Sequence, residues 1–222
     1  MNHVKLTSAW IVLFVAFSPT SSYAAVILSN LSQPNQVDFG ADGAQNAAAG
    51  SFTTSAAGAY KLNSVNVDMN FNAFSGVTTG LRLRANNGGI PGALIENLGS
   101  QTGGPGQQIL TYSSLGSILS PNTTYWVTLG ETGSGNGQQW LGTFSTAETS
   151  PISWTIGNQT FNSGDGGASW HQLNNGFDFS APLFSLDAVP VPEPSSVGLG
   201  IIGLVGLLGL RGVRRRFAVS SA

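Results

Sequence analysis

Apolar and polar residues alternate along several short stretches in the middle of the chain. The clearest is SVNVDMNFN, residues 64–72, where every second residue is large and apolar. Because successive side chains of a β-strand point to opposite faces, this period of two predicts a strand with one buried and one solvated face. The predicted core-facing residues are Val65, Val67, Met69 and Phe71, and the predicted outward residues are Asn66, Asp68 and Asn70.

The same alternation occurs in two other stretches. These are LRLRA, residues 81–85, and TYWVTLG, residues 124–130. The predicted inward residues are Leu81, Leu83, Tyr125, Val127 and Leu129, and the predicted outward residues are Arg82, Arg84, Trp126 and Thr128. Shorter apolar runs predict further strands near Ala25, Phe52, Ile109, Trp140, Trp154, Phe177 and Phe184.

Turn signals rich in Gly, Asn and Pro separate these runs. They are NNGGIPGA at residues 86–93, SPNTT at 120–124, TGSGNG at 132–137 and NSGDGG at 162–167. Gly supplies positive φ and Asn tolerates it, so such clusters end strands and form connections. No long helical period that would supply a crossover helix stands between them. The pattern predicts an all-β body over residues 25–188, an antiparallel β-sandwich of jelly-roll-like form.

The chain begins with the pattern of a secretory signal peptide. A lysine precedes the short apolar core Ala9–Phe17, and Ser22 and Ala24 are small residues at the −3 and −1 positions. We expect cleavage between Ala24 and Ala25, which removes residues 1–24. The alternative is an uncleaved anchor, although the apolar run is shorter than the roughly 20 residues of a membrane span.

The C-terminal region has the pattern of a membrane anchor. Val197–Leu210 is continuously apolar or Gly, and the basic run RGVRRR follows it. Extended to residue 213, this region predicts one short transmembrane helix, residues 197–213. The basic tail, residues 214–222, is expected to stay in the cytoplasm, so the body lies on the opposite side of the membrane.

A Pro-Glu-Pro sequence precedes this helix, within a Pro-rich linker predicted at residues 189–196. The order of this sequence, a short apolar helix and an arginine cluster resembles the PEP-CTERM sorting signal. The resemblance implies recognition by exosortase, a membrane-embedded processing enzyme, in a Gram-negative exported protein associated with exopolysaccharide. The residues that carry it are Val191, Pro192, Glu193, Pro194, Arg211, Arg214, Arg215 and Arg216. The alternative is a plain tail anchor behind a Pro-rich linker.

The body resembles a second family. LRLRANNGGIPGALIENL, LSPNTTYWVTL, SWTIGN and GDGGASW follow one another in an order similar to that of the bacterial choice-of-anchor R domain. The resemblance covers roughly residues 28–188. It implies a β-rich body that occurs with different anchors and has no attributed enzymatic activity.

Composition excludes several classes of protein. Only 8% of the 222 residues are charged, and there is no Cys. Residues 25–188 contain three basic and nine acidic residues, a net charge of −6. Such a body lacks the basic face that nucleic-acid binding requires. Without Cys, disulfides, thiol nucleophiles and Cys–metal sites are excluded.

Few residues of the body offer catalytic or metal chemistry. His171 is the one histidine left after the signal peptide is removed, which disfavours a Ser-His-Asp triad and a zinc site. A glycosidase needs two paired carboxylates; the candidates are Asp38, Asp42, Asp68, Glu96, Glu131, Glu148, Asp165 and Asp178. Residues 38–43 and 162–167 could instead bind Ca²⁺ through Asp and backbone oxygens. Sugar stacking could use Trp126, Trp140, Trp154 and Trp170. We expect no catalytic residue, no metal site and no cofactor.

These features predict an exosortase-sorted protein of the envelope or extracellular matrix, with a non-enzymatic structural role associated with exopolysaccharide and biofilm. Its predicted route begins as an inner-membrane intermediate with the body in the periplasm and ends at the cell surface or in the matrix. One alternative is a carbohydrate-binding module of the cell surface, which several exposed Trp on one face would favour. A less favoured alternative is a secreted hydrolase, which a cleft joining two carboxylates of raised pKa would favour.

Overall fold

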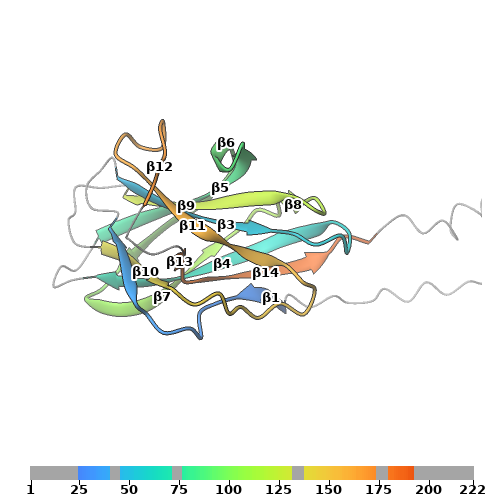
Figure 1. Cartoon of the computed structure of the whole chain (residues 1–222), viewed down its shortest axis with the longest axis horizontal. Helices are drawn as coiled ribbons and strands as arrows, with labels where there is room; N and C mark the ends of the chain where they lie inside the picture. Colours follow the sequence, from blue (N-terminus) through green and yellow to red (C-terminus); the bar gives the residue numbers. More distant parts are fainter. Residues whose placement is uncertain (1–24, 41–45, 72–76, 132–137, 174–179, 193–222) are drawn as a thin grey trace, which may run out of the picture.

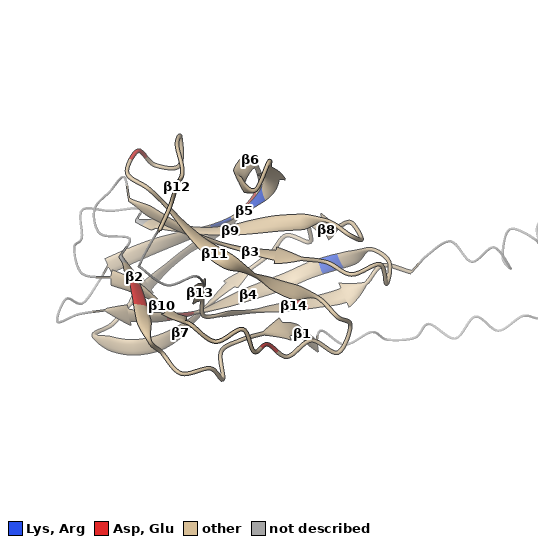
Figure 2. Ribbon diagram, in the orientation of Figure 1, with Lys and Arg blue, Asp and Glu red and all other residues tan. Residues whose placement is uncertain are grey.

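Two antiparallel β-sheets face each other in the computed structural model, which describes residues 25–40, 46–71, 77–131, 138–173 and 180–192 (Figure 1). Apolar side chains from both sheets form one core between them. The predicted all-β, antiparallel fold is confirmed. Charged residues are few and lie scattered over strands and connecting segments (Figure 2).

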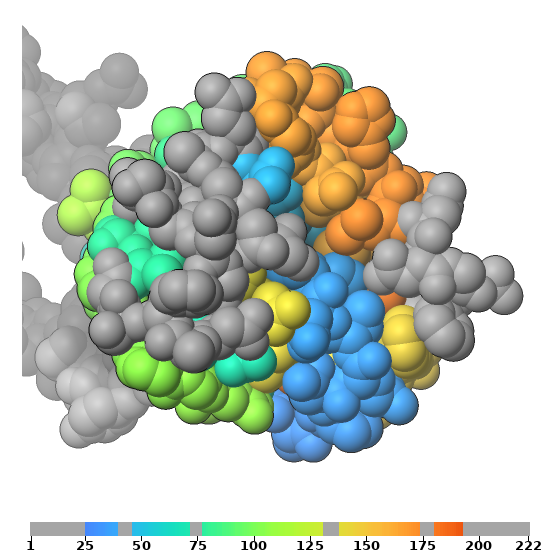
Figure 3. Space-filling view, turned by 90° about the vertical axis from the view of Figure 1, so that its left-hand side faces the viewer, coloured from blue at the N-terminus to red at the C-terminus, as the bar shows by residue number. Residues whose placement is uncertain are grey.

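The first sheet is built around the long strand β4 (Tyr60–Phe71). Its path is β1 (Ala25–Ser29), β14 (Phe184–Pro190), β4, β10 (Gln138–Thr143) and β13 (Ala181–Pro182). Three strands pair off this path: β2 (Val37–Gly40) with β10, and β7 (Gly106–Ser113) and β8 (Ile118–Leu119) with β4. The N-terminal segment, in blue, is prominent at the end of the sandwich shown in Figure 3, where β2 lies beside β10.

The second sheet is built around β3 and β9. Its order is β12 (His171–Gln172), β11 (Thr155–Ser163), β3 (Ala47–Thr53), β9 (Thr124–Glu131), β5 (Val77–Asn87) and β6 (Ile90–Gly103). Gly88 and Gly89 connect β5 to β6 with φ values of 63° and 92°. The turn predicted at residues 86–93 is therefore shorter than expected, because Ile90 already belongs to β6.

All nine residues predicted to face the core are buried. They are Val65, Val67, Met69, Phe71, Leu81, Leu83, Tyr125, Val127 and Leu129. On the other face of β4, Asn66 and Asn70 are half-buried. Asp68 also alternates with the core residues but is only 5% exposed, so the expectation of a solvated side chain was wrong for it. Gln107 crosses from β7 and donates a hydrogen bond to Asp68 Oδ2 at 2.9 Å, and burial raises the pKa of this carboxyl.

Several predicted segments lie outside the described residues. These are the signal peptide, the strand near Phe177, the transmembrane helix and the basic tail. Within the parts of the chain that are described, no helix is long and apolar enough to cross a membrane.

Candidate functional site

The start of strand β1 and the end of strand β14 lie at the same end of the sandwich. β1 begins at Ala25, which pairs with Ala188 of β14, and β14 continues to Pro190, opposite Tyr60 of β4. Because β1 and β14 are antiparallel, the start of one lies beside the end of the other (Figure 1). Ala25 and the start of the Pro-Glu-Pro sequence therefore lie at the same end of the sandwich.

Strand β14 ties the sorting tail firmly to the body. It lies between β1 and β4, and Phe184, Leu186 and Ala188 on its inner face are buried in the core. Beyond the strand, Val191 N donates a hydrogen bond to Ala59 O at 2.9 Å. The strand thus extends to Pro190, two residues into the predicted linker at 189–196.

The structure describes only the first part of the predicted sorting signal. Val191 is half-buried and Pro192 is exposed, so the extended chain emerges into solvent at Pro192. The remaining predicted sorting residues lie outside the described residues; they are Glu193, Pro194, Arg211, Arg214, Arg215 and Arg216. Ala24, on the other side of the predicted signal-peptide cut, also lies outside them.

Residues 190–216 match the family model described as the PEP-CTERM protein-sorting motif. The chain carries a PEP-CTERM sorting motif. This motif indicates an exported protein that is sorted by exosortase and associates with the membrane. The matched range spans all eight residues singled out in the sequence, whose individual roles stay predictions. The resemblance of the body to the choice-of-anchor R domain also stays a prediction.

Comparison with other known proteins adds little for the body. A search of the curated proteins gave no match. Among solved structures, the chain is similar to one from the Gt strain of infectious bursal disease virus, at 9% identity and a TM-score of 0.28. The alignment covers 88% of this chain and 54% of the viral chain, so it spans about half of the latter's length. A likeness this weak carries no argument about fold or function.

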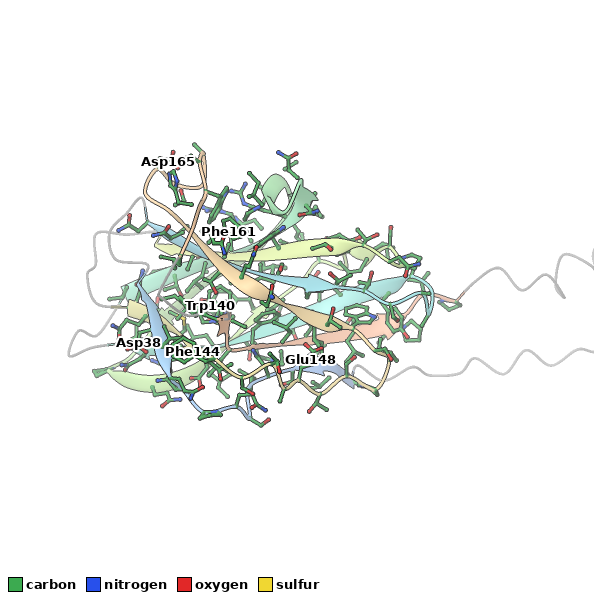
Figure 4. The ribbon with its side chains drawn as sticks, in the orientation of Figure 1. Asp38, Trp140, Phe144, Glu148, Phe161 and Asp165 are labelled. Atoms are coloured by element: carbon green, nitrogen blue, oxygen red, sulfur yellow. The ribbon has the colours of Figure 1, made fainter. Side chains whose placement is uncertain are left out.

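The candidate carboxylates of the body lie on separate segments. Figure 4 shows Asp38 on β2, Glu148 on the segment that follows β10 and Asp165 at the tip of the loop after β11. Burial raises the pKa of both Glu148 and Asp68, the signature expected of a hydrolase acid. These two bind different partners, however: Glu148 accepts a hydrogen bond from Ile156 N of β11, whereas Asp68 accepts from Gln107 of β7. The structure does not describe the remaining candidates, which are Asp42, Asp178 and the side chain of Glu131.

The predicted calcium loop at residues 162–167 is organised by its own hydrogen bonds. Asp165 accepts hydrogen bonds from the Ser169 hydroxyl at 2.6 Å, the Ser169 amide at 2.9 Å, the Ser163 hydroxyl at 2.7 Å and the Ala168 amide at 3.0 Å. These bonds hold the pKa of Asp165 well below its usual range. The carboxylate is thus engaged by its own loop. Across the described ranges, no three His, Asp or Glu side chains form a group that could hold a metal ion.

The four candidate Trp side chains do not form an exposed platform. Trp140 lies between the sheets, where its Nε1 donates to Leu183 O at 2.9 Å (Figure 4). Trp154 packs against Phe52 and Tyr60 in the core, with ring centroids 5.9 and 5.3 Å away. Trp126 is outward but only 2% exposed, and Trp170 is half-buried beside it. The hypothesis that several exposed Trp side chains form one sugar-stacking face is therefore wrong.

Proposed function

We propose that this protein is an exosortase-processed component of the envelope or extracellular matrix, and that its β-sandwich body has a structural, non-enzymatic role beside exopolysaccharide. The observation that carries the proposal is the position of the sorting motif. It starts at the last residue of β14, so processing would act on a chain that is tied directly to a folded, exported body.

The surface chemistry of the body supports a place in hydrated polysaccharide. Along the outer face of β4, the Asn66 side chain donates to Ser185 Oγ at 3.0 Å and accepts from Thr111 Oγ1 at 2.7 Å. Where amide and hydroxyl groups of this kind are exposed, they can both donate hydrogen bonds to sugar hydroxyls and accept them. With 8% charged residues in the chain, ionic attraction has a small part in these contacts.

The connection between body and tail supports the route. Seven residues of β14 pair with β4, so a pull on the tail is distributed over a ladder of backbone hydrogen bonds. Pro192 cannot donate a backbone hydrogen bond and disfavours the helical conformation for the residue before it. The chain is thus kept extended where it leaves the body at Pro192.

Cell fractionation tests this proposal. We expect the wild-type protein in the outer or matrix fraction together with exopolysaccharide. Glu193→Ala should accumulate in the inner membrane, because the charged residue between the two prolines is lost. Asp38→Ala is the matched control, since it removes an exposed carboxylate on β2 far from the tail. Wild-type protein confined to the inner membrane, or equal distribution of Glu193→Ala and wild type, would contradict the proposal.

A further inference from the structure

The outer face of the second sheet contains a pocket of about 250 Å³. Its floor is formed by Ser51 and Thr53 of β3 and by Thr124 and Trp126 of β9. The β5–β6 hairpin forms one wall through Asn86, and residues 157–159 of β11 form the other. Segments that are distant in the sequence therefore converge on one concave surface.

A bulge in β11 creates the second wall. Ile156 pairs with Phe52 and Thr160 pairs with Gly50, so β11 has two more residues than β3 over this interval. Gly157 lies against Ser51, where a Cβ atom would approach Ser51 Oγ to 1.9 Å. The missing side chain lets the bulge lie close to β3, and Asn158 and Gln159 are exposed at the rim.

The floor and the first wall are held in place by internal hydrogen bonds. Asn86 Oδ1 accepts from Trp126 Nε1 at 2.9 Å and from Gly89 N at 3.1 Å. The hydroxyl groups of Thr53 and Thr124 are hydrogen-bonded at 2.8 Å. The Trp126 ring packs edge-on against Phe161, with centroids 5.2 Å apart. A ligand would therefore meet groups that are already ordered, which lowers the entropic cost of binding.

The lining is polar but uncharged. It consists of Ser, Thr, Asn, Gln and Gly residues with one Trp, and contains no Lys, Arg, Asp or Glu. An ionic ligand would lose hydration here without meeting an opposite charge. A sugar hydroxyl, in contrast, both donates and accepts, as do the Ser and Thr hydroxyls, and amides offer both functions. The volume lies below the roughly 300–1,000 Å³ of sites for drug-sized ligands, which suits a single sugar unit.

We propose that this pocket binds one unit of a neutral polysaccharide, with the hydroxyl-bearing floor of β3 and β9 beneath it and the amides of Asn158 and Gln159 at its rim. The proposal names the ligand class for the matrix role proposed above and rests on it. It differs from a Trp platform, since hydrogen-bonding side chains supply the recognition.

Affinity electrophoresis of the mature protein tests the site, with the neutral polysaccharides dextran, mannan and galactan and the acidic polysaccharide alginate in separate gels. The pocket variant is Asn158→Ala with Gln159→Ala. The control variant, Asn35→Ala with Gln101→Ala, removes one exposed Asn and one exposed Gln that do not line the pocket. Thermal unfolding of all three proteins checks that the fold is unchanged.

We expect at least one neutral polysaccharide to retard the wild-type and control proteins, and the apparent Kd to rise about tenfold in the pocket variant. No retardation by any neutral polysaccharide, equal retardation of all three proteins, or a preference for alginate would overturn the proposal. If the protein binds sugar but stays in the inner membrane, the matrix role is contradicted and the sugar-binding pocket is supported. If the protein is processed and reaches the matrix but binds no sugar, the pocket proposal is contradicted and the matrix role is supported.

Discussion

Gly103 faces the buried ring of Phe71 at the end of β6. A Cβ atom there would lie 2.3 Å from that ring, whereas a Cβ atom on the adjacent Gly104 would meet nothing within 4 Å. Phe71 is 1% exposed, so the packed core leaves its ring little room to move. Gly103 is therefore needed for the packing of Phe71, whereas Gly104 only forms part of the connection to β7.

We predict that Gly103→Ala lowers the free energy of unfolding by about 1–3 kcal/mol through overpacking. Gly104→Ala should be neutral or stabilising by up to about 1 kcal/mol, because it lowers the entropy of the unfolded chain. Urea denaturation of both variants measures the difference. Equal stability of the two would show that the contact with Phe71 is relieved at no cost.

Glu96 shows how a buried carboxylate is kept ionised. It is 7% exposed and accepts hydrogen bonds from the Ser117 hydroxyl, the Leu115 amide and the Ser114 hydroxyl. Burial opposes ionisation, but the hydrogen bonds outweigh it and hold the pKa below its ordinary value of 4.5. Because the folded-state pKa is the lower one, the stabilisation is complete above the unfolded-state value and is lost as the pH falls through the folded-state value.

We predict that Glu96→Gln lowers the free energy of unfolding at about pH 7 by roughly 1–2 kcal/mol, since Gln offers one acceptor oxygen to three donors. The difference from wild type should shrink as the pH falls below about 4.5, because the unfolded chain takes up the proton first and the folded protein does so at its lower pKa. Denaturant titrations across this range test it. A difference that is independent of pH would exclude the charge as its cause.

The sequence predicted the apolar side of the strands at residue scale better than the polar side. Alternation identified the core residues because burial follows the pleat. It could not show that Gln107 covers Asp68, or that Asn30 is buried. The Asn30 side chain donates to Pro182 O at 2.9 Å and accepts from Phe184 N at 2.8 Å. These partners are more than 150 residues away along the chain, so no local sequence pattern could predict them.

At the scale of elements, long regular strands were predicted and interrupted ones were not. β4 keeps its period of two from Val65 to Phe71, so the core-facing residues of this part were predicted correctly. β6, IPGALIENLGSQTG, contains Pro and several Gly, and its pairing with β5 shifts register at three places. Each bulge reverses the alternation, and Gly99 adopts a φ of 95°. The sequence therefore suggested a turn over part of what is a 14-residue strand.

We predict that Val67→Asp in the centre of β4 prevents folding of the body, because an unpaired charge would enter a site with 0% exposure. Leu94→Asp in β6 is the control, since that side chain is 53% exposed and the same change should shift stability by only about 0.5 kcal/mol. Protease resistance and circular dichroism of the two proteins distinguish them. A folded, protease-resistant Val67→Asp protein would contradict the assignment of the core face.

At the scale of the whole molecule, the pairing of β1 with β14 brings the first and last strands together. The sequence predicted both terminal signals from local composition, and the match at residues 190–216 confirms the second as a sorting motif. It could not predict that the two signals leave from one end, because that depends on a pairing across more than 150 residues. The same limit applies to the pocket, whose lining comes from four strands and one hairpin turn.

We predict that the arginine cluster sets the orientation of the tail through its charge. Replacing Arg211, Arg214, Arg215 and Arg216 by Ser should let the C-terminus cross the membrane, since each positive charge opposes translocation. Replacing the same four residues by Lys should preserve the orientation. Protease accessibility of a C-terminal tag from the periplasmic side measures this. Protection of the tag in the Ser variant would show that charge does not hold the tail inside.

The mass of the C-terminal peptide tests the sorting account most directly. In cells with exosortase, the mature protein should lack the basic tail. In cells without the enzyme, and for Glu193→Ala in cells that have it, the protein should retain every residue to Ala222. An intact C-terminus at Ala222 in both wild-type and exosortase-deficient cells would contradict processing and leave the tail as a membrane anchor alone.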